Sequence, residues 1–342
     1  MRALRLLLGL WFAGLVCSLS ASAQAVNEFA IPSGSVARRL TSAPDAVWFT
    51  EGNAIGRIDL RGRVIEFPLP PGRSPQGIAF GPDGALWFTE SSRRIGRLTT
   101  DGLLTEYTVP STGLATIVVG PDASLWYTAF FSFVVGKITT AGVATEYPTP
   151  VTPISPDQIA PGPDGALWFT LYSDSRVGRI TTSGQVTMLP LPSGAVARAI
   201  AKGSDGQLWL APESAAIGRL TVSGAYSEIP IPSGGSAAGE GTLATSAVGD
   251  VWFSESVAKR IGRILRNGGL EEFPLPSLAG FPQAITVGPD GAVWFAEFGQ
   301  PIIGRFGFGA VPPSDIPTLS REALLGLALA LALVAITLLR KS

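Results

Sequence analysis

The stretch Gly81-Pro82-Asp83-Gly84-Ala85-Leu86-Trp87-Phe88-Thr89-Glu90 carries the pattern that decides the fold of this chain. A turn containing Asp leads into an apolar run around a tryptophan, and a Gly-Arg pair, Gly96-Arg97, follows. The same order of residues occurs seven times, at intervals of 39 to 43 residues. The tryptophans are Trp48, Trp87, Trp126, Trp168, Trp209, Trp252 and Trp294. A repeat of this length indicates an array of similar structural units.

Each repeat contains four short apolar runs separated by turns. In the second repeat the runs are Ile78–Phe80, Leu86–Thr89, Ile95–Thr99 and Leu104–Val109. β-branched and aromatic residues fill them, which is typical of strands. Four strands in about 40 residues form one blade of a β-propeller. The sequence therefore predicts an all-β fold, a single seven-bladed β-propeller with four-stranded blades, over residues 24–310.

The outermost run of each blade, Glu-Phe-Pro-Leu-Pro in its clearest form, is displaced by one repeat relative to the tryptophans. One copy, Glu28–Pro32, precedes the first tryptophan, and none follows the last Gly-Arg pair, Gly304-Arg305. An incomplete last blade would leave an open sheet edge. We therefore expect the N-terminal copy to pair with the strand near Ile303–Phe306 and to close the ring.

The recurring residues have structural explanations. The tryptophans are expected to fill the space between adjacent blades, because all seven recur at one structural place. The Asp residues favour tight turns through local hydrogen bonds. The Gly of each Gly-basic pair permits close packing, and its Arg is expected to face the Glu of the neighbouring outer strand as a cross-strand pair.

The composition excludes several kinds of chemistry. The chain has 342 residues and a net charge of −1, so no basic excess indicates a nucleic-acid partner. It contains no histidine, and its single cysteine is Cys17. Ser-His-Asp and Cys-His arrangements are therefore excluded, as are zinc sites of the usual ligand types. Carboxylates remain as ligands for Ca²⁺ or Mg²⁺, since hard cations take oxygen ligands.

Both ends of the chain have the features of targeting segments. Residues 1–23 combine Arg2 and Arg5, an apolar run and the cleavage motif Ala21-Ser22-Ala23, which is typical of a secretory signal peptide. This segment contains Cys17, and Val16 before it disfavours lipid attachment. We expect the mature chain to be exported to the bacterial periplasm, the cell surface or the medium.

Residues 311–342 contain an uncharged run from Ala323 to Leu339, followed by Arg340 and Lys341. This run reaches the short end of what spans a bilayer as a helix, so it predicts a transmembrane helix with the C-terminus inside. The run follows Ile316-Pro317-Thr318-Leu319-Ser320, and the tail resembles the IPTL variety of bacterial PEP-CTERM sorting signals, which exosortase-type machinery reads. A permanent anchor and a processed sorting signal are both consistent with it.

The quoted stretch, with Ile95-Gly96-Arg97 and Thr105-Glu106-Tyr107, resembles the virginiamycin B lyase (streptogramin B lyase) family, and the likeness covers residues 26–308. The resemblance implies a seven-bladed propeller that opens the ester ring of a cyclic depsipeptide antibiotic by elimination. It also implies a catalytic histidine, a nearby glutamate, which matches Glu297, and a divalent cation, usually Mg²⁺. The family's Pro-His-Gly/Ala-Ile pattern corresponds to Pro75-Gln76-Gly77-Ile78 and Pro282-Gln283-Ala284-Ile285, which carry glutamine. Glutamine has no proton to exchange near neutral pH and cannot act as the base.

One residue of each blade is expected to lie at the mouth of the central channel, on the face where the chain enters the innermost strand. We call this face the top. Counting back eleven residues from each tryptophan, or ten in the first blade, gives Arg38, Gln76, Ala115, Asp157, Arg198, Gly241 (beside Glu240) and Gln283. These residues differ from blade to blade, as a binding site requires. We predict that Arg38, Gln76, Asp157, Arg198 and Gln283 bind an unidentified ligand; the alternative is a hydrated entrance that binds nothing.

Glutamates stand three residues after four of the tryptophans, at Glu51, Glu90, Glu255 and Glu297. Glu255 and Glu297 are the candidates for catalysis, because adjacent blades would hold them at the same height with converging side chains. Two carboxyl groups that close would raise the pKa of one of them or attract a cation between them.

Two classes of function remain. The first is an exported, surface-sorted binding or scaffold module without the catalytic histidine. The second is an enzyme, either a divergent streptogramin B lyase or a carboxylate–metal enzyme, that uses Glu255 and Glu297.

Overall fold

The computed structural model describes residues 24–150, 153–237, 239, 243–275 and 280–308. The chain divides into two units, of which Val26–Gly307 is one. The predicted signal peptide (1–23) and the predicted transmembrane sorting tail (311–342) lie outside the described residues, as do Glu240 and Gly241. In the part of the chain that is described, no helix is both long and apolar enough to span a bilayer.

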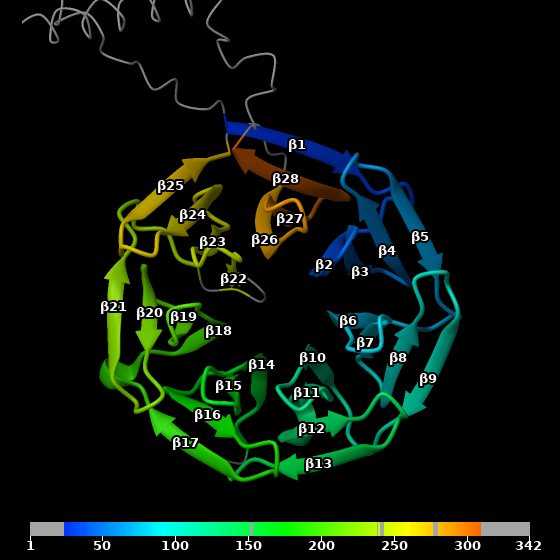
Figure 1. The fold of residues 1–342 in the computed structure, drawn as a ribbon, viewed down its shortest axis with the longest axis horizontal. Helices are drawn as coiled ribbons and strands as arrows, with labels where there is room; N and C mark the ends of the chain where they lie inside the picture. Colours follow the sequence, from blue (N-terminus) through cyan, green and yellow to red (C-terminus); the bar gives the residue numbers. More distant parts are fainter. Residues whose placement is uncertain (1–23, 151–152, 238, 240–242, 276–279, 309–342) are drawn as a thin grey trace, which may run out of the picture. The chain divides into compact units, whose positions relative to one another are not determined.

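Seven antiparallel sheets of four strands each surround a central channel in the unit Val26–Gly307 (Figure 1). The order within each sheet follows the chain from the innermost strand outward, with one exception at the ends of the chain. The prediction of an all-β, seven-bladed propeller with four-stranded blades is confirmed. Two short 3₁₀ helices, η1 (Phe130–Ser132) and η2 (Pro192–Gly194), are the only helical segments in the described ranges.

The blades are numbered from the first complete repeat. Blades 1 to 4 consist of β2 (Ala37–Ala43), β3 (Ala46–Glu51), β4 (Ala54–Asp59) and β5 (Val64–Pro68); β6 (Pro75–Phe80), β7 (Leu86–Glu90), β8 (Arg94–Leu98) and β9 (Leu104–Thr108); β10 (Leu114–Val119), β11 (Leu125–Ala129), β12 (Val134–Ile138) and β13 (Ala144–Pro148); and β14 (Pro156–Pro161), β15 (Leu167–Leu171), β16 (Arg176–Ile180) and β17 (Val186–Pro190). Blades 5 to 7 consist of β18 (Ala197–Lys202), β19 (Leu208–Pro212), β20 (Ala216–Leu220) and β21 (Tyr226–Pro230); β22 (Leu243–Thr245), β23 (Val251–Glu255), β24 (Arg260–Ile264) and β25 (Leu270–Pro274); and β26 (Phe281–Val287), β27 (Val293–Phe298), β28 (Ile302–Phe308) and β1 (Gln24–Ala30).

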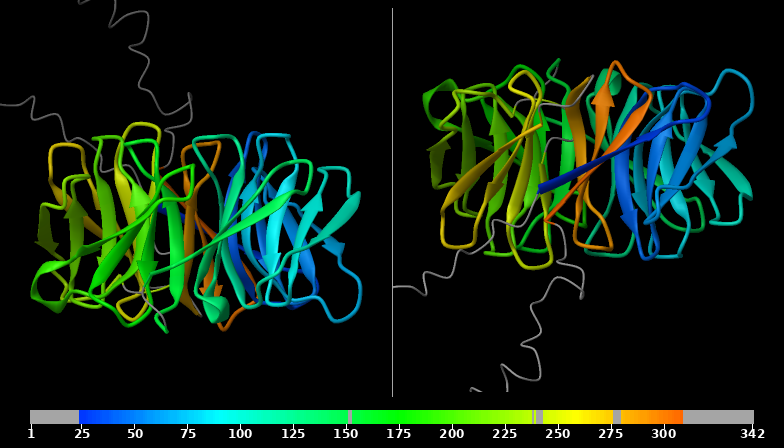
Figure 2. Two further views of the ribbon diagram at one scale, coloured as in Figure 1. Left: turned by 90° about the horizontal axis from the view of Figure 1, so that it is seen from below. Right: turned by 90° about the horizontal axis from the view of Figure 1, so that it is seen from above.

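The N-terminal strand closes the ring. β1 pairs with β28 and supplies the outermost strand of blade 7 (Figures 1 and 2). Just beyond the strand, the Ile31 amide donates to the Pro301 carbonyl at 2.8 Å. The Phe29 ring stacks on Trp294 at 5.8 Å between centroids, so side chains as well as the backbone join the two ends. The predicted closure is confirmed.

The tryptophans fill the contacts between blades, as expected. Trp48 of blade 1 is fully buried and packs with Ile78, Leu86 and Phe88 of blade 2. In six of the seven repeats the Gly of the Gly-basic pair makes room for an aromatic ring of the preceding strand, and at Gly218 the ring is Tyr226 of the following strand. A Cβ atom at Gly96 would lie 2.0 Å from Phe88 Cζ. The repeat is therefore a packing unit whose large and small residues are matched across neighbouring strands.

The basic residue after that Gly pairs with the Asp of its own blade's turn and not, as predicted, mainly with the outer strand; in blade 6 Arg263 also lies 3.7 Å from Glu271 of the outer strand. Arg97 Nε lies 2.6 Å from Asp83 Oδ2, and the other Oδ atom of Asp83 accepts from Trp87 Nε1 at 3.0 Å. The outer-strand glutamate is out of reach because Glu106 stands opposite Gly96, one place away from Arg97 in the strand register. Side chains at successive positions point to opposite sheet faces, so Arg97 and Glu106 cannot meet. In blades 2, 3, 4 and 7 the turn Asp therefore links the tryptophan to the basic residue.

Candidate functional site

Five of the seven predicted mouth residues line one cavity. Arg38, Gln76, Ala115, Asp157 and Gln283 come from blades 1, 2, 3, 4 and 7, and they surround a space of about 770 Å³. Three aromatic side chains complete the wall, Phe130, Phe131 and Phe298. We call this space the mouth cavity. Its size falls in the range of small-molecule sites in proteins.

The mouth residues point into the cavity because each lies in a β-bulge of the innermost strand. In blade 1, Ala37 pairs with Glu51 and Arg39 with Thr50, so Arg38 is the extra residue between them. The same shift in register occurs in blades 2, 3, 4, 5 and 7. A bulge redirects one side chain out of the regular alternation. The repeat therefore presents one variable residue per blade at the channel.

A threonine holds the bulge in place in blades 1 to 4, and the sequence analysis did not identify it. Thr89 Oγ1 accepts from the Gly77 amide of its own blade at 2.9 Å and donates to the Ala115 carbonyl of the next blade at 2.7 Å. Thr50 and Thr128 make the corresponding pairs of bonds. The signal in the sequence is the hydroxyl residue two places after the tryptophan. These buried hydroxyls connect the mouth residues of successive blades.

Arg198 lies next to the mouth cavity and faces Asp157, the carboxylate of that cavity. Its Nη1 atom is 3.8 Å from Asp157 Oδ2, and its guanidinium stacks over the Tyr172 ring at 4.2 Å. Asp157 is 3% exposed, so its charge is largely removed from water and lies within reach of this guanidinium. Arg198 also lies 3.9 Å from Glu213. The structure thus brings Asp157 and Arg198 together as a charge pair.

The polar groups of Gln76 and Gln283 are used differently. Gln76 Nε2 donates to Ser74 Oγ at 3.0 Å, and its Oε1 accepts from Arg38 Nη1 at 3.3 Å. The amide of Gln76 is therefore held in one orientation. The Gln283 side chain, by contrast, makes no hydrogen bond to any residue of the described ranges, although its backbone carbonyl accepts from Ser254 Oγ at 2.6 Å.

Aromatic side chains form the upper edge of the mouth cavity. Phe131 and Phe298 are 72% and 59% exposed, which is unusual for residues of this size. Phe130 contacts both Phe131 and Tyr172 edge to face, with centroids 5.3 and 5.2 Å apart. The mouth cavity therefore combines apolar surface with a few polar side chains, as ligand sites do.

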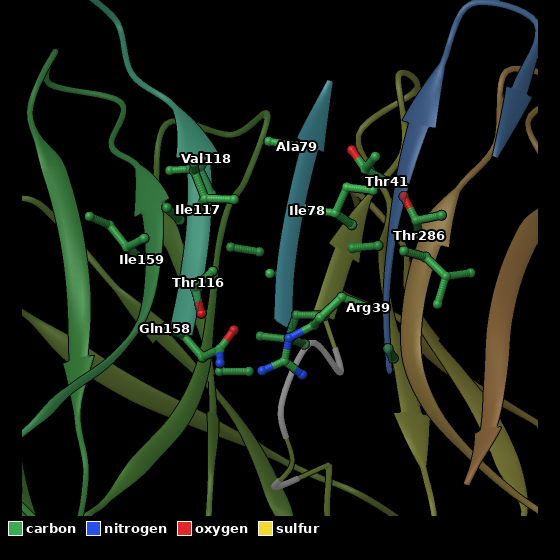
Figure 3. A pocket seen from close by; sticks show the side chains of 18 of the residues that line it. Arg39, Thr41, Ile78, Ala79, Thr116, Ile117, Val118, Gln158, Ile159 and Thr286 are labelled. Carbon is green, nitrogen blue, oxygen red and sulfur yellow. The ribbon is translucent and has the colours of Figure 1, made fainter. Parts of the chain in front are cut away.

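A second cavity of about 560 Å³ continues into the channel, and all seven innermost strands line it. Figure 3 shows Arg39 and Gln158 reaching into this channel cavity from different strands. Arg39 also lines the mouth cavity, so it lies where the two spaces meet. The remaining lining is mainly Ile, Val, Ala and Thr.

Glu255 and Glu297 lie at two separate places beneath the top loops, and neither lines the two cavities. Ser233 Oγ donates to Glu255 Oε2 at 2.6 Å, whereas the Gly280 amide donates to Glu297 Oε2 at 3.0 Å. Both side chains are fully buried. The carboxyl group that affects each of them comes from the outer strand of its own blade, Glu272 for Glu255 and Glu28 for Glu297. The structure does not bring the two candidates together.

Burial dominates the electrostatics of these glutamates. It raises the pKa of Glu51 to about 8, with the charge of Glu66 as the second cause. Burial also raises the pKa values of Glu255 and Glu297 above their usual range. In blade 2 burial raises the pKa of Glu90, but Arg73 lies 3.6 Å from it and acts in the opposite direction. Each of these buried carboxyl groups lies near a second carboxyl group from the outer strand of its own blade, which favours its protonated form.

The described residues do not form a Mg²⁺ site of the kind that the family resemblance implies. No three Asp, Glu, His or Cys side chains come together anywhere in the described ranges. The mouth cavity contributes one carboxylate, Asp157, which already faces Arg198. A cation there would approach a guanidinium, so no metal-dependent step follows from these residues.

Comparison with known proteins gives consistent matches. The family model for the virginiamycin B lyase family matches residues 9–116 and 110–329. A virginiamycin B lyase from Nocardia farcinica (strain IFM 10152) is 43% identical over 58 residues, which is 17% of this chain and 20% of that relative's length.

Two solved structures cover much more of the chain. A streptogramin B lyase structure superposes with a TM-score of 0.76 at 33% identity, over 84% of this chain and 99% of that one. A catalytically inactive variant of virginiamycin B lyase from Staphylococcus aureus, with a histidine replaced by alanine, was solved with quinupristin. It superposes with a TM-score of 0.75 at 33% identity, over 83% of this chain and 99% of that one.

Proposed function

Because this chain belongs to the virginiamycin B lyase family, we propose that it is an exported propeller that binds a ligand in the mouth cavity without opening that ligand by elimination. The observation that carries the proposal is the pair Gln76 and Gln283 at the mouth of a chain that contains no histidine. An elimination needs a group that removes a proton, and a glutamine amide cannot do so near neutral pH.

The inactive variant from Staphylococcus aureus supports the separation of binding from catalysis. That protein lacks one histidine, is described as catalytically inactive, and was nevertheless solved with quinupristin. The present chain contains no histidine, and its mouth cavity of about 770 Å³ carries exposed aromatic side chains. Binding, unlike elimination, needs only features that this cavity has.

The alternative, a carboxylate–metal enzyme, has less support. It would use Glu255 and Glu297, which are fully buried, lie in separate blades and do not line either cavity. A catalytic group has to reach the reacting atoms, within about 3 Å directly or through one water molecule.

Export and surface sorting form the second part of the proposal. They rest on the signal-peptide pattern of residues 1–23 and on the sorting-signal pattern of residues 311–342. The test is cell fractionation with mass spectrometry of the two ends of the protein. A mature chain that starts near Gln24 in the exported fraction would support export. An intact N-terminus in the cytoplasmic fraction would contradict it.

Catalysis is tested with quinupristin, Mg²⁺ and the purified protein, followed by liquid chromatography and mass spectrometry. Elimination leaves the mass unchanged and alters retention and fragmentation, whereas hydrolysis adds one water. We expect only the cyclic compound, at the level of a protein-free control. Linear product that forms faster than in the control would overturn the proposal, and its loss in Glu297→Gln would indicate the carboxylate enzyme instead.

A further inference from the structure

The charge at the mouth cavity is distributed unevenly. Arg38 is exposed, lines the cavity and forms no ion pair with a carboxylate in the described ranges. The cavity's carboxylate, Asp157, stands three blades away and is opposed by Arg198 at 3.8 Å. A positive charge on the blade 1 side is therefore left without a negative partner.

A hydrogen bond to Gln76 orients the Arg38 guanidinium, and its other N–H groups remain available to a ligand. Its Nη1 atom donates to Gln76 Oε1 at 3.3 Å, and Gln76 is fixed in turn by Ser74. A guanidinium carries five N–H donors, so one such bond leaves a face that matches a carboxylate. The Gln283 side-chain amide, which lines the same cavity, adds two N–H donors and a carbonyl acceptor that no residue in the described part of the chain engages.

Apolar side chains line the cavity on both sides of Arg38. Phe130 and Phe131 belong to blade 3, two blades from Arg38, and Phe298 belongs to blade 7, which neighbours blade 1 on the other side. A molecule with one anionic end and one aromatic or aliphatic end would place each end against matching chemistry. A purely cationic ligand would meet Arg38 without compensation.

We propose that the mouth cavity selects an amphipathic carboxylic acid, with Arg38 binding the carboxylate, Gln283 a neighbouring amide and the phenylalanines the apolar group. This inference rests on the proposed binding function and names its ligand class. The peptide C-terminus and the free organic acid share this chemistry.

The test uses three small probes and the purified full-length protein. N-Acetylphenylalanine offers the carboxylate, the amide and the ring; N-acetylphenylalanine amide lacks the carboxylate; 3-phenylpropanoate lacks the amide. Binding is measured by ligand-observed NMR at low and high salt. The variants are Arg38→Gln and, as a charge-matched control at an exposed turn, Arg63→Gln.

We expect the acid to bind at least about tenfold more tightly than its amide, and this preference to disappear in Arg38→Gln but not in Arg63→Gln. Weaker binding of 3-phenylpropanoate than of N-acetylphenylalanine would indicate that the ligand carries an amide, as a peptide C-terminus does. Equal binding of acid and amide would overturn the carboxylate inference while leaving the binding function intact. No binding of any probe would also overturn it, whereas the turnover experiment with quinupristin tests separately the proposed absence of elimination.

Discussion

A threonine hydroxyl two residues after the tryptophan makes two buried hydrogen bonds in blades 1, 2 and 3. It satisfies an amide freed by the bulge and reaches a carbonyl of the next blade. An unsatisfied buried amide or carbonyl costs about 1–3 kcal/mol. One small polar residue therefore stabilises both the bulge and the junction between blades.

Replacing Thr89 by Val tests this role. We expect the free energy of unfolding to fall by about 1–3 kcal/mol, because the Gly77 amide and the Ala115 carbonyl lose their partner. Urea unfolding followed by tryptophan fluorescence measures the change. Thr108→Val on the exposed part of β9 is the control and should change stability by less than about 0.5 kcal/mol. Equal effects of the two substitutions would contradict the prediction.

Glu51 makes the stability of the fold depend on pH. Its pKa is raised from 4.5 to about 8 in the folded protein, so the folded chain holds this proton more tightly than the unfolded chain. The stabilisation is fully present below about pH 4.5 and is lost as the pH rises towards 8. Above that range Glu51 is ionised in the folded protein, where burial and the nearby Glu66 disfavour its charge.

Glu51→Gln should remove this dependence. The amide resembles the protonated acid, so we expect the variant to exceed the original protein by about 1–3 kcal/mol at pH 9 and to differ little at pH 4.5. Unfolding free energies at the two pH values measure it. Glu213→Gln, at an exposed carboxyl, should show no such difference. A variant that gains nothing at pH 9 would show that Glu51 is ionised without cost.

At the scale of elements, the blade depends on a glycine beneath an aromatic ring. Gly96 in β8 lies under Phe88 of β7, and the same pairing occurs at Gly56 with Phe49 and at Gly304 with Phe295. The ring occupies the place that a Cβ atom would need. The second and third strands can therefore pair closely only while the residue beneath the ring has no side chain.

Gly96→Ala is expected to destabilise the protein by about 1–3 kcal/mol, since its Cβ atom would lie 2.0 Å from the Phe88 ring. Thermal unfolding measures the loss. The control is Gly269→Ala, where the new Cβ atom would meet the flexible Asn267 side chain at 3.2 Å and Leu265 Cδ1 at 3.5 Å. A change in Gly96→Ala no larger than in the control would show that the ring moves aside.

At the scale of the whole propeller, seven similar blades are closed by one strand from the other end of the sequence. β1 covers the outer edge of β28, so blade 7 has the same four strands as its neighbours. Its removal would leave the edge of β28 unpaired and Trp294 without its Phe29 partner. Exposed edges of this kind promote association between chains.

Deleting residues 1–32 should therefore lower the thermal midpoint and produce oligomers in size-exclusion chromatography, with a loss on the order of several kcal/mol. A chain that starts at Gln24 keeps β1 and is the control, and it should unfold like the intact protein. An unchanged midpoint after the larger deletion would mean that closure contributes little to stability.

The sequence alone determined the blade count, the four strands per blade, the closure by Glu28–Pro32 and the mouth positions. These features follow from the spacing of Trp48 and its six equivalents, because equal spacing in a closed ring places equivalent residues at equal heights. The absence of histidine was likewise readable from composition.

Only the tertiary structure decided where individual side chains point. Arg97 pairs with Asp83 instead of Glu106 because a shift of one place in strand register reverses the sheet face. Glu255 and Glu297 stand on the second strand of their blades, where side chains project between sheets and not into the channel. Arg38 and Gln283 reach the channel because a bulge in the innermost strand redirects them. The bond that Thr50 donates to the Gln76 carbonyl of the next blade forms only once the two blades are packed together.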